Sequence, residues 1–158
     1  FDVKFILNKH YNIKNLNFFS NETKVFLANI ILNKNFEVED FEKIKVKTFN
    51  DEVKNNDFLV EKSNKIVVLG EIFDAQPLLK TLYKKTDKRT LSKNFSSEIK
   101  INLNKTLTGT DDVVSNFAMI ASVNKGSYDK LSLKGNFSKN EIVECPYIKS
   151  IKTKKHFR

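Results

Sequence analysis

Apolar and polar residues alternate in several short segments of this chain, a pattern typical of strands with one buried face. The alternation is clearest over residues 42–48 and 98–104, where β-branched or leucine side chains occupy every second position. Similar runs occupy residues 1–5, 117–123 and 131–137, and short polar or glycine-containing stretches separate the runs. We therefore predict about eight to ten strands that pair mainly in sequence order.

Residues 56–79 contain the one clear change from strand to helix. Two apolar runs around Ser63-Asn64 predict a hairpin, and a helix is predicted next over about residues 75–85. We expect Asp74 to cap this helix, because its carboxylate can accept hydrogen bonds from the free amides of the first turn. Pro77 falls within that turn, where a missing N–H group costs nothing.

The chain has 158 residues, enough for one domain with a core. A sheet of about nine strands is roughly 40–50 Å wide, whereas a helix of about 11 residues is roughly 16 Å long. The helix therefore leaves most of the apolar face uncovered. We predict that residues 1–158 form a single mainly β segment, a curved antiparallel meander with one short helix and an open apolar groove. A β-sandwich or a closed barrel is the alternative.

Groups suited to catalysis or metal binding are sparse. His10 and His156 lie near opposite ends of the chain, each without cysteine or carboxylate at metal-ligand spacing, so we expect no metal site. Cys145 is the single cysteine, and we expect it to pack as a small apolar side chain. The glycines form no phosphate-binding loop, and no nucleophile with a base is visible. We therefore expect neither catalysis nor a cofactor.

The chain is basic, with a net charge of +9, and its lysines are spread along the whole sequence. In residues 42–48 they lie opposite the apolar side chains instead of among aromatic ones. Proteins that bind single-stranded nucleic acid combine basic and stacking aromatic side chains on one surface. We therefore interpret the charge as solvation of exposed strand faces, and we expect no nucleic-acid partner.

No apolar run is long enough to cross a membrane, because a spanning helix needs about 20 apolar residues and the longest run lies within residues 25–32. The sequence starts at Phe1 and shows no secretion signal. We expect it to be a fragment of a longer, repetitive β-groove protein, with neighbouring segments of that protein as partners.

A strand that ends in Gly70, an aromatic-aspartate step at Phe73-Asp74 and a short helix with Pro77-Leu78-Leu79 follow one another here, preceded by Asn56-Asp57-Phe58. In this order of features the chain resembles the AsmA-like family of Gram-negative envelope proteins, particularly the YhdP-type members with an AsmA-like C-terminal region. The similarity extends over residues 40–145. It implies a long, curved antiparallel sheet with a lipid-lined groove.

The resemblance also implies a location and a role. Such proteins are tethered to the inner membrane, project into the periplasm and are linked to phospholipid movement toward the outer membrane. Phospholipid is therefore the expected ligand, held by a stripe of apolar side chains. The candidate groove residues are the one-sided apolar positions Ile44, Val46, Phe58, Val60, Ile99, Ile101, Leu103, Phe117, Met119, Leu131 and Leu133.

The sequence allows two interpretations of these residues. They line an open lipid groove, or they form the closed core of a ligand-free β-sandwich that serves as an interaction or scaffold module. Periodicity alone does not separate the two, because both place the same side chains on one buried face.

Overall fold

The computed structural model describes residues 2–6, 10–83, 95–109, 113–137 and 141–148. These residues form eleven strands of one sheet and one helix. In chain order the elements are β1 (Asp2–Ile6), β2 (His10–Ser20), β3 (Thr23–Leu32), β4 (Val38–Asp40), β5 (Lys43–Asn50), β6 (Val53–Lys62), β7 (Ile66–Asp74), α1 (Gln76–Tyr83), β8 (Ser97–Leu107), β9 (Val113–Asn124), β10 (Ser127–Asn136) and β11 (Ile142–Ile148).

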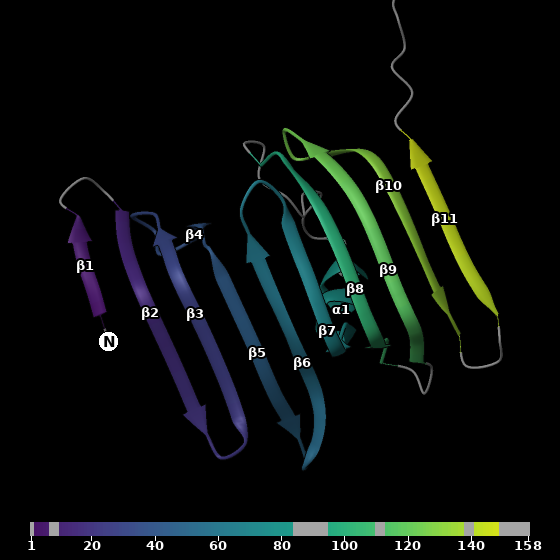
Figure 1. Ribbon diagram of the computed structural model, residues 1–158, viewed down its shortest axis with the longest axis horizontal. Helices are drawn as coiled ribbons and strands as arrows, with labels where there is room; N and C mark the ends of the chain where they lie inside the picture. The colour runs from purple at the N-terminus through teal and green to yellow at the C-terminus, as the bar shows by residue number, and fades with distance from the viewer. Residues whose placement is uncertain (1, 7–9, 84–94, 110–112, 138–140, 149–158) are drawn as a thin grey trace, which may run out of the picture.

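The sheet is a single open layer, with α1 behind β7 and β8 in the view of Figure 1. Its strand order is β1-β2-β3-β5-β6-β7-β8-β9-β10-β11, and the short β4 pairs with β3 beside this path. The predicted mainly β fold with an open sheet and one short helix is therefore confirmed. Within the described residues, the sheet neither closes into a barrel nor folds onto a second layer.

Neighbouring strands are antiparallel except for β7 and β8, which run parallel. Parallel neighbours cannot be joined by a tight turn and need a crossover connection, usually through a helix. Here the chain leaves β7 at Asp74 and passes through α1 before it returns as β8. The crossover through α1 thus lets β8 run in the same direction as β7, inside an otherwise antiparallel meander.

The polar stretch of residues 50–56 is a turn only at its start, because β5 ends at Asn50 and β6 begins at Val53. Asp51 and Glu52 have φ angles of 47° and 63° and form a tight turn, so that Asn50 already pairs with Val53. Short hairpin loops require such left-handed residues, because these match the twist of the two strands. β6 therefore includes Val53 and the polar residues that follow it.

The start of α1 matches its sequence signals. The amide of Gln76 donates a hydrogen bond of 3.0 Å to Oδ1 of Asp74, as expected for an N-cap residue. The amide of Leu79 donates to the carbonyl oxygen of Ala75 at 2.9 Å, which closes the first helical turn. On the other side, the amide of Asp74 donates to Oδ1 of Asn56 at 2.9 Å, so β6 also fixes this corner.

Replacing Asp74 with alanine should lower the free energy of unfolding by about 1 kcal/mol, the usual effect of losing a helix cap. Asparagine at this position keeps a side-chain oxygen, so Asp74→Asn should stay within a few tenths of a kcal/mol of the original protein. Denaturant unfolding of both variants measures the difference. Equal losses would show that the carboxylate charge, and not the cap, matters.

Buried apolar residues are concentrated on β7 to β9 and directly before α1. No large side chain of the described residues is fully buried, as expected for a single layer. The rings of Phe58 and Phe73 pack edge to face, with centroids 5.3 Å apart, beside the start of α1. Apart from Ile30 on β3, the buried apolar residues lie on β7 to β9 or directly before α1: Ile66, Ala75, Leu103, Val114, Ala121 and Val123.

Candidate functional site

One face of the sheet carries apolar side chains in register from strand to strand. Directly paired residues on neighbouring strands project their side chains from the same face, so the register defines rows across the sheet. The longest row passes through every strand from β2 to β11 except β4. Its members are Leu16, Leu27, Ile44, Val60, Val68, Ile101, Met119, Leu133 and Cys145.

Two further rows lie on either side of the first. One contains Phe18, Val25, Val46, Phe58, Gly70, Leu103 and Phe117. The other contains Ile66, Ile99, Ala121, Leu131 and Tyr147. We call the surface formed by the three rows the apolar face. All the candidate groove residues identified in the sequence belong to it.

The apolar face is only partly covered. Leu103 retains 5% of its accessible surface, whereas the other candidate groove residues are half-buried. Exposure rises toward both sides of the sheet, where Phe18 on β2 is 56% exposed and Tyr147 on β11 is 47% exposed. The ten strands of the main path leave nine gaps, so the sheet is roughly 43 Å wide. The eight residues of α1 extend over roughly 12 Å.

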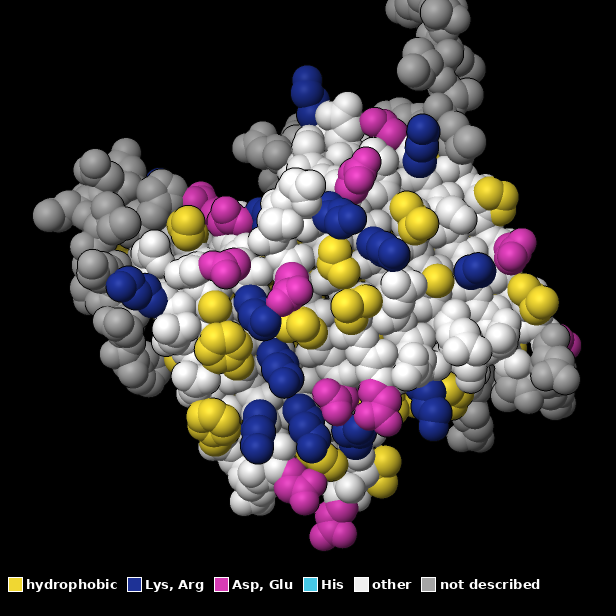
Figure 2. All heavy atoms as spheres, viewed as in Figure 1, with side chains coloured by type: hydrophobic (Ala, Val, Ile, Leu, Met, Phe, Trp, Pro, Cys, Tyr) yellow, Lys and Arg dark blue, Asp and Glu magenta, His cyan; other side chains and the backbone are white. Residues whose placement is uncertain are grey.

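The opposite surface, here called the charged face, has a different character. Figure 2 views the sheet from this side, with lysine and acidic side chains spread among scattered apolar ones. Lys45 pairs with Leu59 on this face, and Lys47 pairs with Asp57. Because α1 lies behind the sheet in the same view, the helix is on the apolar face. The apolar face therefore has one short element to cover it within the described residues.

Gly70 allows a close approach of β7 to β6 that a larger residue would prevent. A β-carbon at this position would lie 2.6 Å from Cβ of Phe58 and 2.7 Å from the carbonyl oxygen of Asp57. The pairing of β6 with β7 shifts between these same two residues of β6. The glycine thus allows a close backbone approach at an irregularity that leads into the Asp74 cap.

Several members of the apolar face were not identified as candidate groove residues. Leu16, Leu27 and Val68 lie in the longest row, as does Cys145. Cys145 is exposed, so the expectation that it packs as a small apolar side chain is wrong. In β3 nearly every residue after Lys24 is apolar, so the alternation could not assign a face to its side chains. Only the register between paired strands shows which face each of these side chains occupies.

No protein-family model, curated protein or solved structure matches this chain. Within the described ranges, no three histidine, cysteine or acidic side chains lie together as a metal site would require. His156 lies outside those ranges. In the same part of the chain, no helix has the length and apolar character needed to cross a bilayer.

One ion pair connects β4 with β6. Lys62 donates a hydrogen bond to Asp40, and this contact holds the pKa of Asp40 below its ordinary value of 3.8. The ammonium of Lys62 also lies 5.8 Å from the ring centroid of Phe41. These contacts attach β4 to a strand with which it does not pair directly.

This ion pair should make stability slightly dependent on pH. The pKa of Asp40 is lower in the folded state, so the stabilisation is present above 3.8 and disappears as the pH falls through the folded value. Because the Asp40 side chain is 49% exposed, we expect at most about 0.5 kcal/mol. Unfolding free energies of the original protein and Asp40→Asn should converge in acid. A constant difference would show that the ion pair does not contribute.

Proposed function

We propose that the apolar face binds the acyl chains of phospholipids. On this proposal the chain is a non-catalytic segment of a periplasmic protein, tethered to the inner membrane through other parts of its sequence, that contributes to lipid transport between the inner and outer membranes. The main support is the unbroken longest row of apolar side chains, which extends far beyond the reach of α1. The AsmA-like order of features in the sequence leads to the same expectation.

The energy of acyl burial is sufficient for binding without a specific polar contact. Burial of one methylene group contributes roughly 0.8 kcal/mol, so a dozen contribute about 10 kcal/mol in total. Loss of translational and rotational freedom and ordering of the lipid offset much of this gain. For the acyl chain to bind with a net gain in free energy, it must therefore contact several adjacent strands. A continuous row of apolar side chains offers this contact.

The two edge strands of the sheet, β1 and β11, support a related proposal about partners. Within the described residues, β1 and β11 each pair with one neighbour and so present one free edge. Free edges are templates for further strands. We propose that neighbouring segments of the same longer chain continue the sheet here and extend the apolar face past Phe18 and Tyr147.

A ligand-free scaffold makes a different prediction. Two copies packed face to face through their apolar faces would form a sandwich and bury the same side chains. Titration with a fluorescent phospholipid, together with sedimentation analysis, separates the two functions. A monomer that binds the lipid supports the proposal, whereas a dimer that ignores the lipid supports the scaffold.

A further inference from the structure

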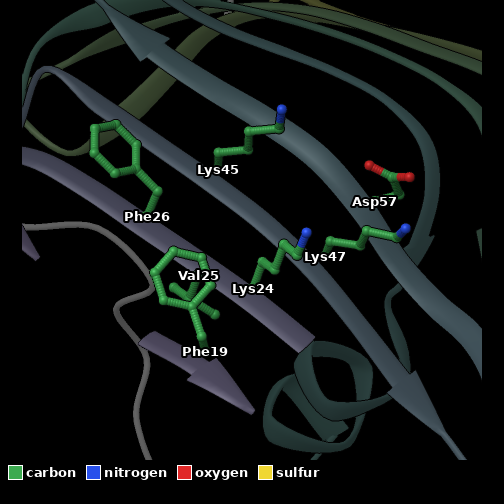
Figure 3. Close-up of a pocket in the computed structure, with 7 residues that line it drawn as sticks. All are labelled: Phe19, Lys24, Val25, Phe26, Lys45, Lys47 and Asp57. Carbon is green, nitrogen blue, oxygen red and sulfur yellow. The ribbon is translucent and has the colours of Figure 1, made fainter. Parts of the chain in front are cut away.

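A second feature lies on the charged face, away from the proposed lipid surface. A hollow of about 370 Å³ lies over β2, β3, β5 and β6. Figure 3 shows Phe19 and Phe26 on one side of it and three lysine side chains on the other, with Asp57 beyond them. We call it the lysine hollow; its lining residues are Phe19, Lys24, Val25, Phe26, Lys45, Lys47 and Asp57.

The strand register explains how residues so distant in sequence meet here. Phe19 pairs with Lys24, and Lys24 pairs in turn with Lys47 on the next strand. Phe26 pairs with Lys45, two residues from Lys47 on the same face. The expectation that the lysines of residues 42–48 lie away from aromatic side chains is wrong for Lys45 and Lys47. The aromatic neighbours come from other strands.

The lysines of the hollow differ from nearby lysines, whose positive charges are balanced by acidic side chains. Lys43 pairs with Glu61 at 2.8 Å, and Lys54 contacts both Asp57 and Glu71. No ion pair is formed by Lys24 or Lys45 among the residues that the structure describes.

Asp57 does not compensate for this imbalance, because its carboxylate accepts a hydrogen bond of 3.1 Å from Lys54. The ammonium of Lys47 lies 5.3 Å from the ring centroid of Phe49. Like charges directly opposite each other on paired strands are destabilising, and Lys24 and Lys47 are such a pair. An anion bound between them would remove this repulsion.

We propose that the lysine hollow binds a phosphate group that carries a small organic substituent. Lysine is a common phosphate ligand and acts there as a point charge. The volume of the hollow is near the lower end of the range for small-molecule sites, which fits a phosphate ester better than a bare ion. Phe19, which is 66% exposed, and Phe26 offer apolar contact to the substituent. A phospholipid headgroup and a soluble phosphate ester share this chemistry.

The test uses the double variant Lys24→Gln/Lys45→Gln. Binding of glycerol phosphate is measured by calorimetry, and binding to vesicles of phosphatidylglycerol in phosphatidylcholine is measured by co-sedimentation. We expect the variant to bind at least about tenfold more weakly, because each lysine supplies a charge-assisted hydrogen bond. The original protein should also bind more weakly at high salt. Both lysines are exposed, so the variant should fold.

The matched control is Lys100→Gln/Lys134→Gln, which removes the same charge from exposed positions elsewhere on the charged face. It should bind like the original protein. Vesicle binding that the double variant Lys24→Gln/Lys45→Gln loses, without binding of glycerol phosphate, identifies a lipid headgroup as the source, and binding of glycerol phosphate identifies a soluble ester. The proposal is overturned by equal loss in both variants, by absence of binding to both probes, or by selective binding of an oligonucleotide at these lysines. Acyl binding on the apolar face should be unchanged in both variants, so failure here leaves the proposed function standing.

Discussion

Replacement of Ile101 by aspartate is expected to weaken phospholipid binding more than tenfold while the sheet stays folded. Ile101 lies in the longest apolar row, between Val68 on β7 and Met119 on β9. A carboxylate there would have to lose its hydration against an acyl chain, a cost of at least about 2 kcal/mol without a partner. Because Ile101 is half-buried in the free protein, the same carboxylate can stay hydrated when no lipid is bound. Titration with a fluorescent phospholipid and circular dichroism measure the two effects.

The matched control for this change is Ile120→Asp. Ile120 is 63% exposed and pairs with Lys100 and Ser132 on the charged face, so the same substitution there should leave lipid binding intact. Unfolding of Ile101→Asp would indicate a closed core and favour the scaffold. Equal effects of both variants on binding would mean that the apolar face is not the lipid surface.

Replacement of Gly70 by alanine is expected to lower the free energy of unfolding by about 2–3 kcal/mol. The new β-carbon would meet the backbone of β6, including the Asp57 carbonyl oxygen at 2.7 Å and Cα of Phe58 at 2.9 Å. Neither atom can move without separating β6 from β7. The free energy of unfolding, obtained from denaturant titration, measures the cost.

Gly135→Ala is the corresponding control. There the added carbon would lie 2.5 Å from Cγ1 of Val114, but the nearest backbone atom is 3.6 Å away. A side chain can shift where a backbone cannot, so the cost should be about 1 kcal/mol. If the two variants lose equal stability, the close approach at Gly70 does not constrain this corner.

Much of the fold followed from local patterns. Clean alternation over Ile99 to Leu103 and over Ile44 to Val46 identified strands whose apolar side chains do share one face. The cap at Asp74 was also predictable, because it depends only on residues within the first helical turn. The parallel pairing of β7 with β8 was not, since a helix between two strands is compatible with either direction.

The lysine hollow could not be predicted from local patterns. Its lysines lie on β3 and β5, and its aromatic side chains lie on β2 and β3. In β3 apolar side chains point to both faces: Val25 belongs to the apolar face, and Phe26 pairs with Lys45 on the charged face. Only the register between strands brings Phe26 and Lys45 together.

Native mass spectrometry of the purified protein, followed by lipid extraction, tests the central claim most directly. If the apolar face binds acyl chains, a folded monomer should carry phospholipid that is released on denaturation, and Ile101→Asp should reduce the amount bound whereas Ile120→Asp should not. A folded monomer or dimer without lipid, which also ignores added phospholipid, would contradict the account and leave the face as a protein-packing surface.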